Sequence, residues 1–166
     1  PVQIEKHALE IIDSGTMMLS MGGDHFVTYP LLKAHAKKHG PLSLIHFDAH
    51  CDTWDDDGQR LDHGSMFLRA LREEIIDPDT SVQIGIRTHN SETYGFTILG
   101  APWVHREGVP AVVDVIKEVV GERNAYLTGF NCFLMAVIAR LYVLMEKLYV
   151  TRQNIKNNLE NKDTFT

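Results

Sequence analysis

Side chains that can bind metals occupy every second position at the end of the stretch LIHFDAHCD, residues 44–52: His46, Asp48, His50 and Asp52. The apolar residues before them are typical of a buried strand. A further histidine, His25, follows a second apolar run in the stretch MGGDH. Imidazole nitrogens combined with carboxylate oxygens suit manganese, iron, zinc or cobalt better than calcium, which prefers oxygen ligands alone. The residue types and their spacing therefore predict a transition-metal site.

The elements that must position these side chains are short strands alternating with amphipathic helices. Helical spacing of apolar residues predicts helices over 2–13, 26–39, 65–76 and 109–121. Short apolar runs predict strands over 16–23, 42–48, 81–87 and 125–130. This alternation predicts an α/β fold with a parallel sheet and helices on its faces. Ligand sites in such sheets lie beyond the carboxyl ends of the strands, so we expect His25 near the residues that follow the 42–48 strand.

The composition limits the classes of protein to which this chain can belong. Its 166 residues, of which 44% are hydrophobic, predict one compact domain. The net charge of -6 argues against a nucleic acid or an anionic membrane as a partner. Only two cysteines occur, which favours a reducing compartment over a disulfide-bonded secreted domain. We therefore expect a cytoplasmic globular protein.

The C-terminal part of the chain has a different composition. Residues 132–150 form the most apolar stretch, but Arg140 divides it into runs shorter than the roughly 20 residues of a membrane span. The stretch therefore predicts a buried or oligomer-facing helix. Residues 151–166 are polar and predict a disordered tail, which leaves 1–150 as the expected domain. Because the chain opens on Pro1 without a methionine, we expect it to be a piece of a longer protein.

Four motifs together resemble one family of enzymes. They are MGGDH, HFDAHCDT, DHGSMF and SVQIGIRT, and they resemble the ureohydrolase (arginase/agmatinase) family of binuclear manganese enzymes, with most similarity to agmatinases. The resemblance runs from about Ile4 to Thr128. It implies a three-layer α/β/α parallel sheet of the arginase type, here incomplete, and a homo-oligomer. It also implies hydrolysis of a small guanidino substrate, agmatine, to urea and putrescine by a hydroxide that two manganese ions activate.

The resemblance assigns roles to individual residues. It implies that His25 and Asp52 bind one manganese ion, that His50 binds the other, and that Asp48 is shared between the ions and takes part in catalysis. His63, in DHGSMF, matches the histidine that contacts the substrate or transfers a proton. His46 is at a position that varies in the family, so it is interpreted as a core residue or as a support behind the ligands.

One departure from the family pattern weighs against a complete site. After NAYLT the family has an Asp-x-Asp motif that supplies two further metal ligands, whereas this chain continues GFNCFLM, with Asn131 near the first lost aspartate. Two divalent ions carry four positive charges, and only Asp48 and Asp52 remain to balance them. A long N-terminal region of the family is also missing before Pro1. Two hypotheses therefore stand: an agmatinase-type hydrolase, or a degenerate or truncated, inactive fragment that binds at most one metal.

Overall fold

The computed structural model describes residues 1–55, 61–121, 147 and 149–153. The chain divides into two compact units, residues 1–122 and 123–166. The first unit contains all the elements discussed below. Of the second unit, the described residues are helical. The domain boundary expected at residue 150 stays a prediction.

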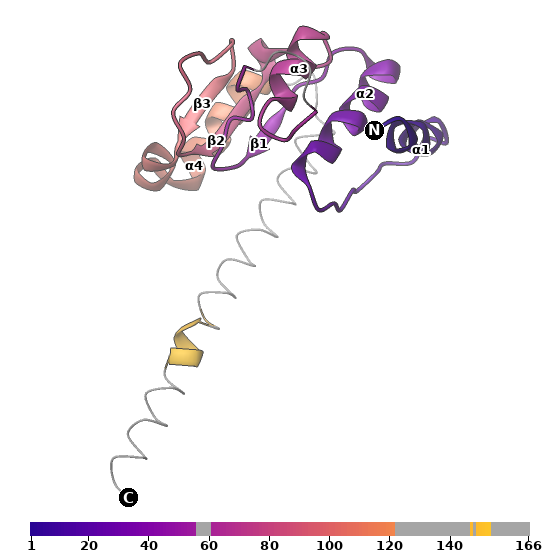
Figure 1. Cartoon of the computed structure of the whole chain (residues 1–166). Helices are drawn as coiled ribbons and strands as arrows, with labels where there is room; N and C mark the ends of the chain where they lie inside the picture. The colour runs from indigo at the N-terminus through magenta and orange to yellow at the C-terminus, as the bar shows by residue number, and fades with distance from the viewer. Residues whose placement is uncertain (56–60, 122–146, 148, 154–166) are drawn as a thin grey trace, which may run out of the picture. The chain divides into compact units, whose positions relative to one another are not determined.

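The centre of the first unit is a parallel sheet of three strands (Figure 1). The strands are β1 (Ile45–Phe47), β2 (Val82–Ile86) and β3 (Thr97–Gly100), paired in the order β1-β2-β3. Because all three run in the same direction, their carboxyl ends meet at one edge of the sheet. Between Ile84 and Ile86 the pairing of β2 with β3 shifts by one residue at Gly85.

One face of the sheet is covered by the helix α4 (Ala101–Val120). Its residues Val112, Ile116 and Val120 form an apolar cluster with side chains of β2 and β3. Inside α4 the backbone is interrupted at Gly108, whose φ is 78°, just before Pro110. The predicted helix over 109–121 is therefore only the second part of a longer element, because a proline near a helix start and a preceding glycine look like a helix N-terminus in the sequence.

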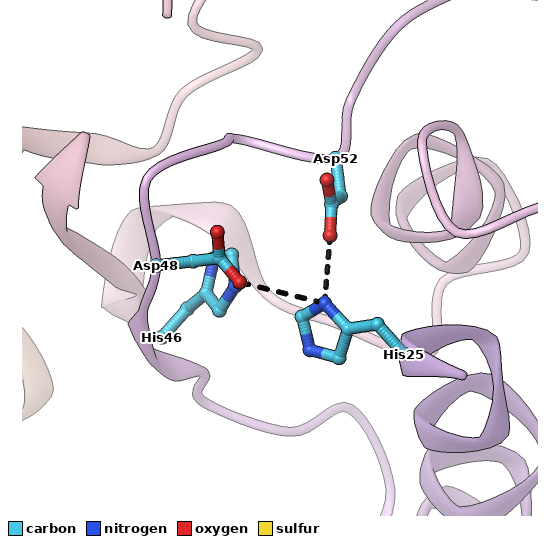
Figure 2. Close-up of side chains that lie close together, drawn as sticks. All are labelled: His25, His46, Asp48 and Asp52. Carbon is cyan, nitrogen blue, oxygen red and sulfur yellow. Dashed lines mark hydrogen bonds and ion pairs between the residues drawn. The ribbon is translucent and has the colours of Figure 1, made fainter. Parts of the chain in front are cut away.

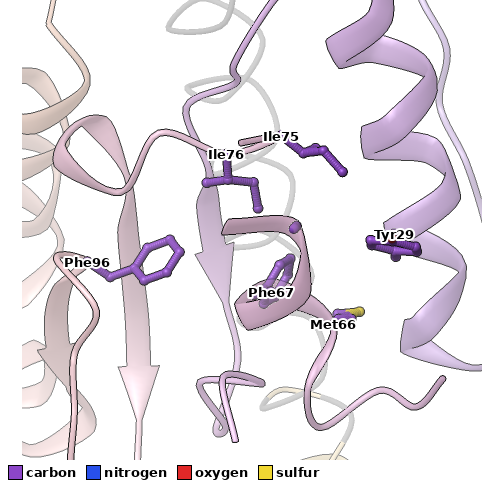
Figure 3. Close-up of a cluster of buried hydrophobic side chains, with 7 residues drawn as sticks. Tyr29, Met66, Phe67, Ile75, Ile76 and Phe96 are labelled. Carbon is purple, nitrogen blue, oxygen red and sulfur yellow. The ribbon is translucent and has the colours of Figure 1, made fainter. Parts of the chain in front are cut away.

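The opposite face is covered by α2 (Thr28–His39) and α3 (Met66–Arg72). Tyr29 of α2 and Met66 and Phe67 of α3 share a buried cluster with Ile76 and Phe96 (Figure 3). Helices on both faces of a parallel sheet make three layers, so the predicted α/β/α architecture is confirmed for this part of the fold. Two short 3-10 turns, η1 (His25–Val27) and η2 (Pro78–Thr80), precede α2 and β2 respectively.

A further helix, α1 (Val2–Asp13), packs on α2. Ala8 and Ile12 of α1 form a small buried cluster with Ala34 of α2. Lys38 donates a hydrogen bond of 2.5 Å to the Ile12 carbonyl, which places a cation at the C-terminal end of α1. Apolar spacing predicts both helices, and both are confirmed.

The structure differs from the sequence-based elements in three further places. The strand predicted over 16–23 is wrong: these residues form no strand, and Met17, Leu19 and Met21 are exposed. A strand needs a neighbour for its backbone hydrogen bonds, and an apolar run alone does not supply one. The short strand β3 was missed, and α3 ends before Glu74, whose φ of 56° is left-handed. The strand predicted over 125–130 and most of the 132–150 helix lie outside the described residues.

Candidate metal centre

The loop after β1 carries three of the predicted ligands and is bound to the end of β2. The Asp48 N–H donates to the Ile84 carbonyl at 3.1 Å, and the Arg87 N–H donates to the Ala49 carbonyl at 2.8 Å. Gly85, with a φ of 88°, allows this approach, because a Cβ there would lie 3.3 Å from the Asp48 carbonyl oxygen. The loop therefore starts from a fixed position at the carboxyl end of the sheet.

Buried hydrogen bonds hold the second half of the same loop. Gln83, fully buried on β2, donates from Nε2 to the Cys51 carbonyl at 2.8 Å. The Phe67 N–H, at the start of α3, donates to the Asp52 carbonyl at 3.0 Å. Asp52 itself has a left-handed φ of 51°, which aspartate tolerates better than most residues. These bonds fix the Asp52 carboxylate on the inner side of the loop.

His25 reaches the site from a tight turn. The Asp24 carboxylate caps η1 by accepting a hydrogen bond from the Phe26 N–H at 2.8 Å. At Gly22 in this turn an added Cβ would lie 2.7 Å from Cγ2 of Val27, so a larger residue would displace the Val27 side chain. The turn directs the His25 ring between Asp48 and Asp52 (Figure 2).

His25, His46, Asp48 and Asp52 form what we call the inner group (Figure 2). His25 Nδ1 lies 2.8 Å from Oδ2 of Asp52 and 3.7 Å from Oδ2 of Asp48. His46 Nε2 also lies 3.7 Å from Oδ2 of Asp48. One ligand atom from each residue can be chosen so that all of them are within 4.8 Å of one another. Such convergence is what a single bound cation requires.

Burial and hydrogen bonds shift the pKa values of Asp52, Asp48 and His46. Burial raises the pKa of Asp52, and the nearby His25 opposes that effect. Burial would also raise the pKa of Asp48, but hydrogen bonds from the N–H and the ring of His50 leave it below its usual value. Burial, with a smaller effect of His25, lowers the pKa of His46 to about 4. His46 is therefore neutral at pH 7, which is the form that binds metals.

The other two predicted site residues lie outside the inner group. The side chain of His50 is 52% exposed, with Nδ1 at 3.2 Å from Oδ1 of Asp48, the oxygen that the inner group does not use. The side chain of His63 is 64% exposed, with Nδ1 at 3.3 Å from Oδ2 of Asp24. We call Asp24 and His63 the outer pair. The roles that the resemblance implies for His50 and His63 stay predictions.

His46 is the member of the inner group that the sequence interpretation placed outside the ligand set. The signal that groups it with the ligands is the alternation His46, Asp48, His50, Asp52. Neither of its ring nitrogens has a hydrogen-bond partner among the described residues, although the ring is buried. Two carboxylates and two imidazoles, one of them buried without a hydrogen-bond partner, fit one divalent cation.

Several relatives match this chain closely. An agmatinase of Chromobacterium violaceum is 56% identical over 127 residues, which are 75% of this chain and 39% of the relative. An agmatinase of Neisseria meningitidis is 53% identical over 126 residues, 76% of this chain and 41% of the relative. The chain thus spans about two fifths of the length of these curated relatives.

Solved structures agree with this likeness. A crystal structure of a hypothetical agmatinase from Burkholderia thailandensis has a TM-score of 0.69 and 55% identity, over 71% of this chain and 38% of that one. Proclavaminate amidino hydrolase from Streptomyces clavuligerus has a TM-score of 0.65 and 36% identity, over 72% of this chain and 43% of that one. The incomplete arginase-type fold expected from the sequence is confirmed.

Two family models match the chain. One describes the Bap31/Bap29 transmembrane region and matches residues 113–158, a smaller part of the chain. Where this match overlaps the first unit, Ile116 and Val120 are buried in the cluster that α4 forms with the sheet. Among the described residues no helix is long and apolar enough to cross a membrane. The other model describes the arginase family and matches residues 1–129, so the chain belongs to the arginase family.

Proposed function

We propose that this chain carries part of the active site of an agmatinase-type hydrolase, which cleaves the guanidino group of agmatine to give urea and putrescine. The observation that carries the proposal is the convergence of His25, Asp48 and Asp52 in a chain whose relatives with more than half of the aligned residues identical are agmatinases. The proposed metal is manganese. A homo-oligomeric state and a cytoplasmic location are further predictions from the resemblance and the composition.

Different residues of the site would bind the metal and contact the substrate. His25, Asp48 and Asp52 would hold a divalent cation, which supplies acidification of water and polarisation of the substrate when bound. Asp48 presents Oδ2 to the inner group and Oδ1 to His50. This arrangement suits a carboxylate that is shared between two binding positions. His63, exposed at the outer pair, would contact the substrate or move a proton to the departing amine.

The second hypothesis, an inactive chain that binds at most one metal, has its own support. Within the described residues the inner group contains two carboxylates, which balance one divalent cation. The sequence after NAYLT contains no Asp-x-Asp motif in place of the one in the family pattern. On this hypothesis the inner group binds a cation without completing the hydrolysis.

One experiment separates the two hypotheses. The purified chain is loaded with manganese, the bound metal is counted, and urea release from agmatine is followed on the same sample. The hydrolase hypothesis predicts about two manganese ions per chain and urea at a rate that scales with bound metal. One ion or none without urea would exclude it for this chain and support the second hypothesis. A His63→Ala variant serves as the control, because it should retain the metal and lose urea release.

A further inference from the structure

We propose that the indole ring of Trp54 binds the aminobutyl arm of agmatine, with the terminal ammonium of that arm over the face of the ring. This inference deepens the proposed function and rests on it, because it names a residue for the part of the substrate that is not hydrolysed. Neither the four motifs nor the family resemblance assigns a role to Trp54, which directly follows the motif HFDAHCDT.

The main chain around Trp54 is fixed by two hydrogen bonds. Asn90 Nδ2 donates to Oγ1 of the buried Thr53 at 2.6 Å. The Trp54 N–H donates to the Gly64 carbonyl at 3.0 Å. Gly64 directly follows His63, so the second bond joins the loop after β1 to the segment that carries His63. Trp54 is therefore tied to both segments that carry predicted site residues.

The indole ring contacts the same two segments. Its centroid lies 5.9 Å from that of the His50 ring, with the two planes tilted by 59°. A Cβ added to Gly64 would lie 3.0 Å from Cε3 of the indole and 3.6 Å from Oδ1 of Asp62. Because Gly64 has no side chain, the ring can lie against its backbone, close to the Asp62 carboxylate. The ring therefore stands beside His50 and next to a negative charge.

Trp54 nevertheless keeps much of its surface open to solvent. It is 41% exposed, although a tryptophan side chain gains more than most from burial. Among the described residues the cation–π contact is that of Lys33 with the ring of Tyr29, and none in that part of the chain involves Trp54. An indole that is fixed at its base and open on its surface can bind an apolar chain or a cation from outside the protein.

The chemistry of agmatine matches this surface. The guanidino carbon would have to reach the inner group, and Trp54 lies outside that group, next to His50. The ring would therefore meet the butyl chain and the terminal ammonium. The butyl chain buries apolar surface against an indole, and an ammonium is attracted by the negative face of the ring. The nearby Asp62 carboxylate favours a cation at the same place.

The direct test compares agmatine with butylguanidine, which keeps the guanidino group and the butyl chain but lacks the ammonium. The dissociation constant of each is measured on the full, manganese-loaded chain, or the KM where urea is released. Trp54→Leu should weaken agmatine binding by at least about fivefold and butylguanidine binding by less than about twofold. Trp54→Phe keeps an aromatic face and should restore most of the preference for agmatine. Equal losses for the two ligands, or no loss, in Trp54→Leu that circular dichroism shows to be folded would overturn the proposal.

The two tryptophans of the chain allow a second, independent measurement. Trp103 lies on α4 and packs on the cluster that this helix forms with the sheet. In Trp103→Phe the remaining fluorescence, that of Trp54, should change on mixing with agmatine. In Trp54→Phe, the matched control, the fluorescence of Trp103 should stay constant. Unchanged Trp54 fluorescence at agmatine concentrations that saturate the chain would overturn the proposal.

Urea release from agmatine separates this inference from the proposed function. Agmatine binding that depends on Trp54, without urea release, would support the role of Trp54 and exclude hydrolysis by this chain. Urea release with the same KM for agmatine in the wild type and in Trp54→Leu would support hydrolysis and overturn the role of Trp54. A chain that binds no agmatine would overturn both.

Discussion

The inner group and the outer pair present similar chemical groups in different surroundings. Asp52 of the inner group is buried. Its loop is held by hydrogen bonds from Gln83 Nε2 to the Cys51 carbonyl and from the Phe67 N–H to the Asp52 carbonyl. In the outer pair the side chains of Asp24 and His63 are 60% and 64% exposed and meet at 3.3 Å. The inner group is therefore packed in place before any ligand binds, whereas the outer pair is exposed and is held only by the cap that Asp24 makes on η1. A preorganised arrangement such as the inner group suits a metal ion.

Removing the packing beneath the inner group should have the largest effect. Phe67 is buried and lies against the rings of His25 and His46. Phe67→Ala should reduce the free energy of unfolding by about 3–5 kcal/mol and weaken metal binding as the rings lose their support. Urea denaturation and Zn²⁺ titration measure the two effects. If the metal affinity of folded Phe67→Ala equalled that of the wild type, the inner group would not depend on packing.

Exchanging one carboxylate in each region compares the two directly. Asp52→Asn removes a buried charge from the inner group while keeping the side-chain shape, and should weaken Zn²⁺ binding by at least about 100-fold. Asp24→Asn is the matched variant and should change the affinity by less than about threefold, since Asp24 caps η1 outside the inner group. Calorimetric titration of both variants checks this. Equal losses would abolish the distinction between the regions.

Gln83 tests whether the loop is held by the sheet. Gln83→Leu leaves the buried Cys51 carbonyl without its donor, and should cost about 1–2 kcal/mol of stability. The cost is at the lower end because Oε1 of Gln83 has no partner among the described residues, so leucine also removes an unpaired polar atom. Thermal unfolding of Gln83→Leu and the wild type measures this loss of stability. A stabilised variant would show that the loop keeps its position without this bond.

A polar contact with one buried partner should have an intermediate effect. Tyr29 donates to Oε1 of Glu73 at 2.6 Å, and Lys33 donates to Oε2 at 3.1 Å. Burial would raise the pKa of Glu73, but these two donors leave that pKa below its usual value. A lowered carboxyl pKa stabilises the fold above the unfolded value and loses that effect as pH falls through the folded pKa.

Tyr29→Phe should therefore cost about 1 kcal/mol at pH 7 and progressively less as the pH falls through the lowered pKa of Glu73. Unfolding by urea at pH 7 and at a series of lower pH values measures the difference. A cost that grew on acidification would contradict the sign of this argument.

The smallest effect on stability is expected in the outer pair. His63→Ala should change the free energy of unfolding by less than about 0.5 kcal/mol, because a contact between two exposed polar side chains contributes little. Chemical denaturation tests this, with His35→Ala as the comparison on α2. A decrease in the free energy of unfolding above about 2 kcal/mol would mean that the outer pair stabilises the fold as a buried interaction does.

Much of the layered fold could be predicted from the sequence, because its helices repeat apolar residues at helical spacing. Prediction from the sequence fails where the structure of a segment depends on a neighbouring segment. The run of Met17, Leu19 and Met21 has the composition of a strand, yet these side chains are exposed and the segment forms none. The strand β3 was missed because it is short and leads directly into α4.

The residue types of the candidate site could be predicted from the sequence, but not which of the side chains converge in the inner group. Strand alternation grouped His46 with Asp48, His50 and Asp52, and the resemblance then favoured His50 over His46. In the structure the chain leaves β1 after Phe47, so the alternation ends and His50 turns to solvent while His46 stays buried. Periodicity within a strand cannot show where the strand stops.

Gly85 makes the position of Asp48 depend on a residue that has no side chain. Its left-handed φ of 88°, and the 3.3 Å that would separate an added Cβ from the Asp48 carbonyl oxygen, exclude most other amino acids. In a screen of random variants this position would tolerate as little change as a metal ligand, although a glycine offers no side-chain atom to a metal or a substrate. Intolerance to substitution at the end of β2 would therefore report on backbone shape and not on chemistry.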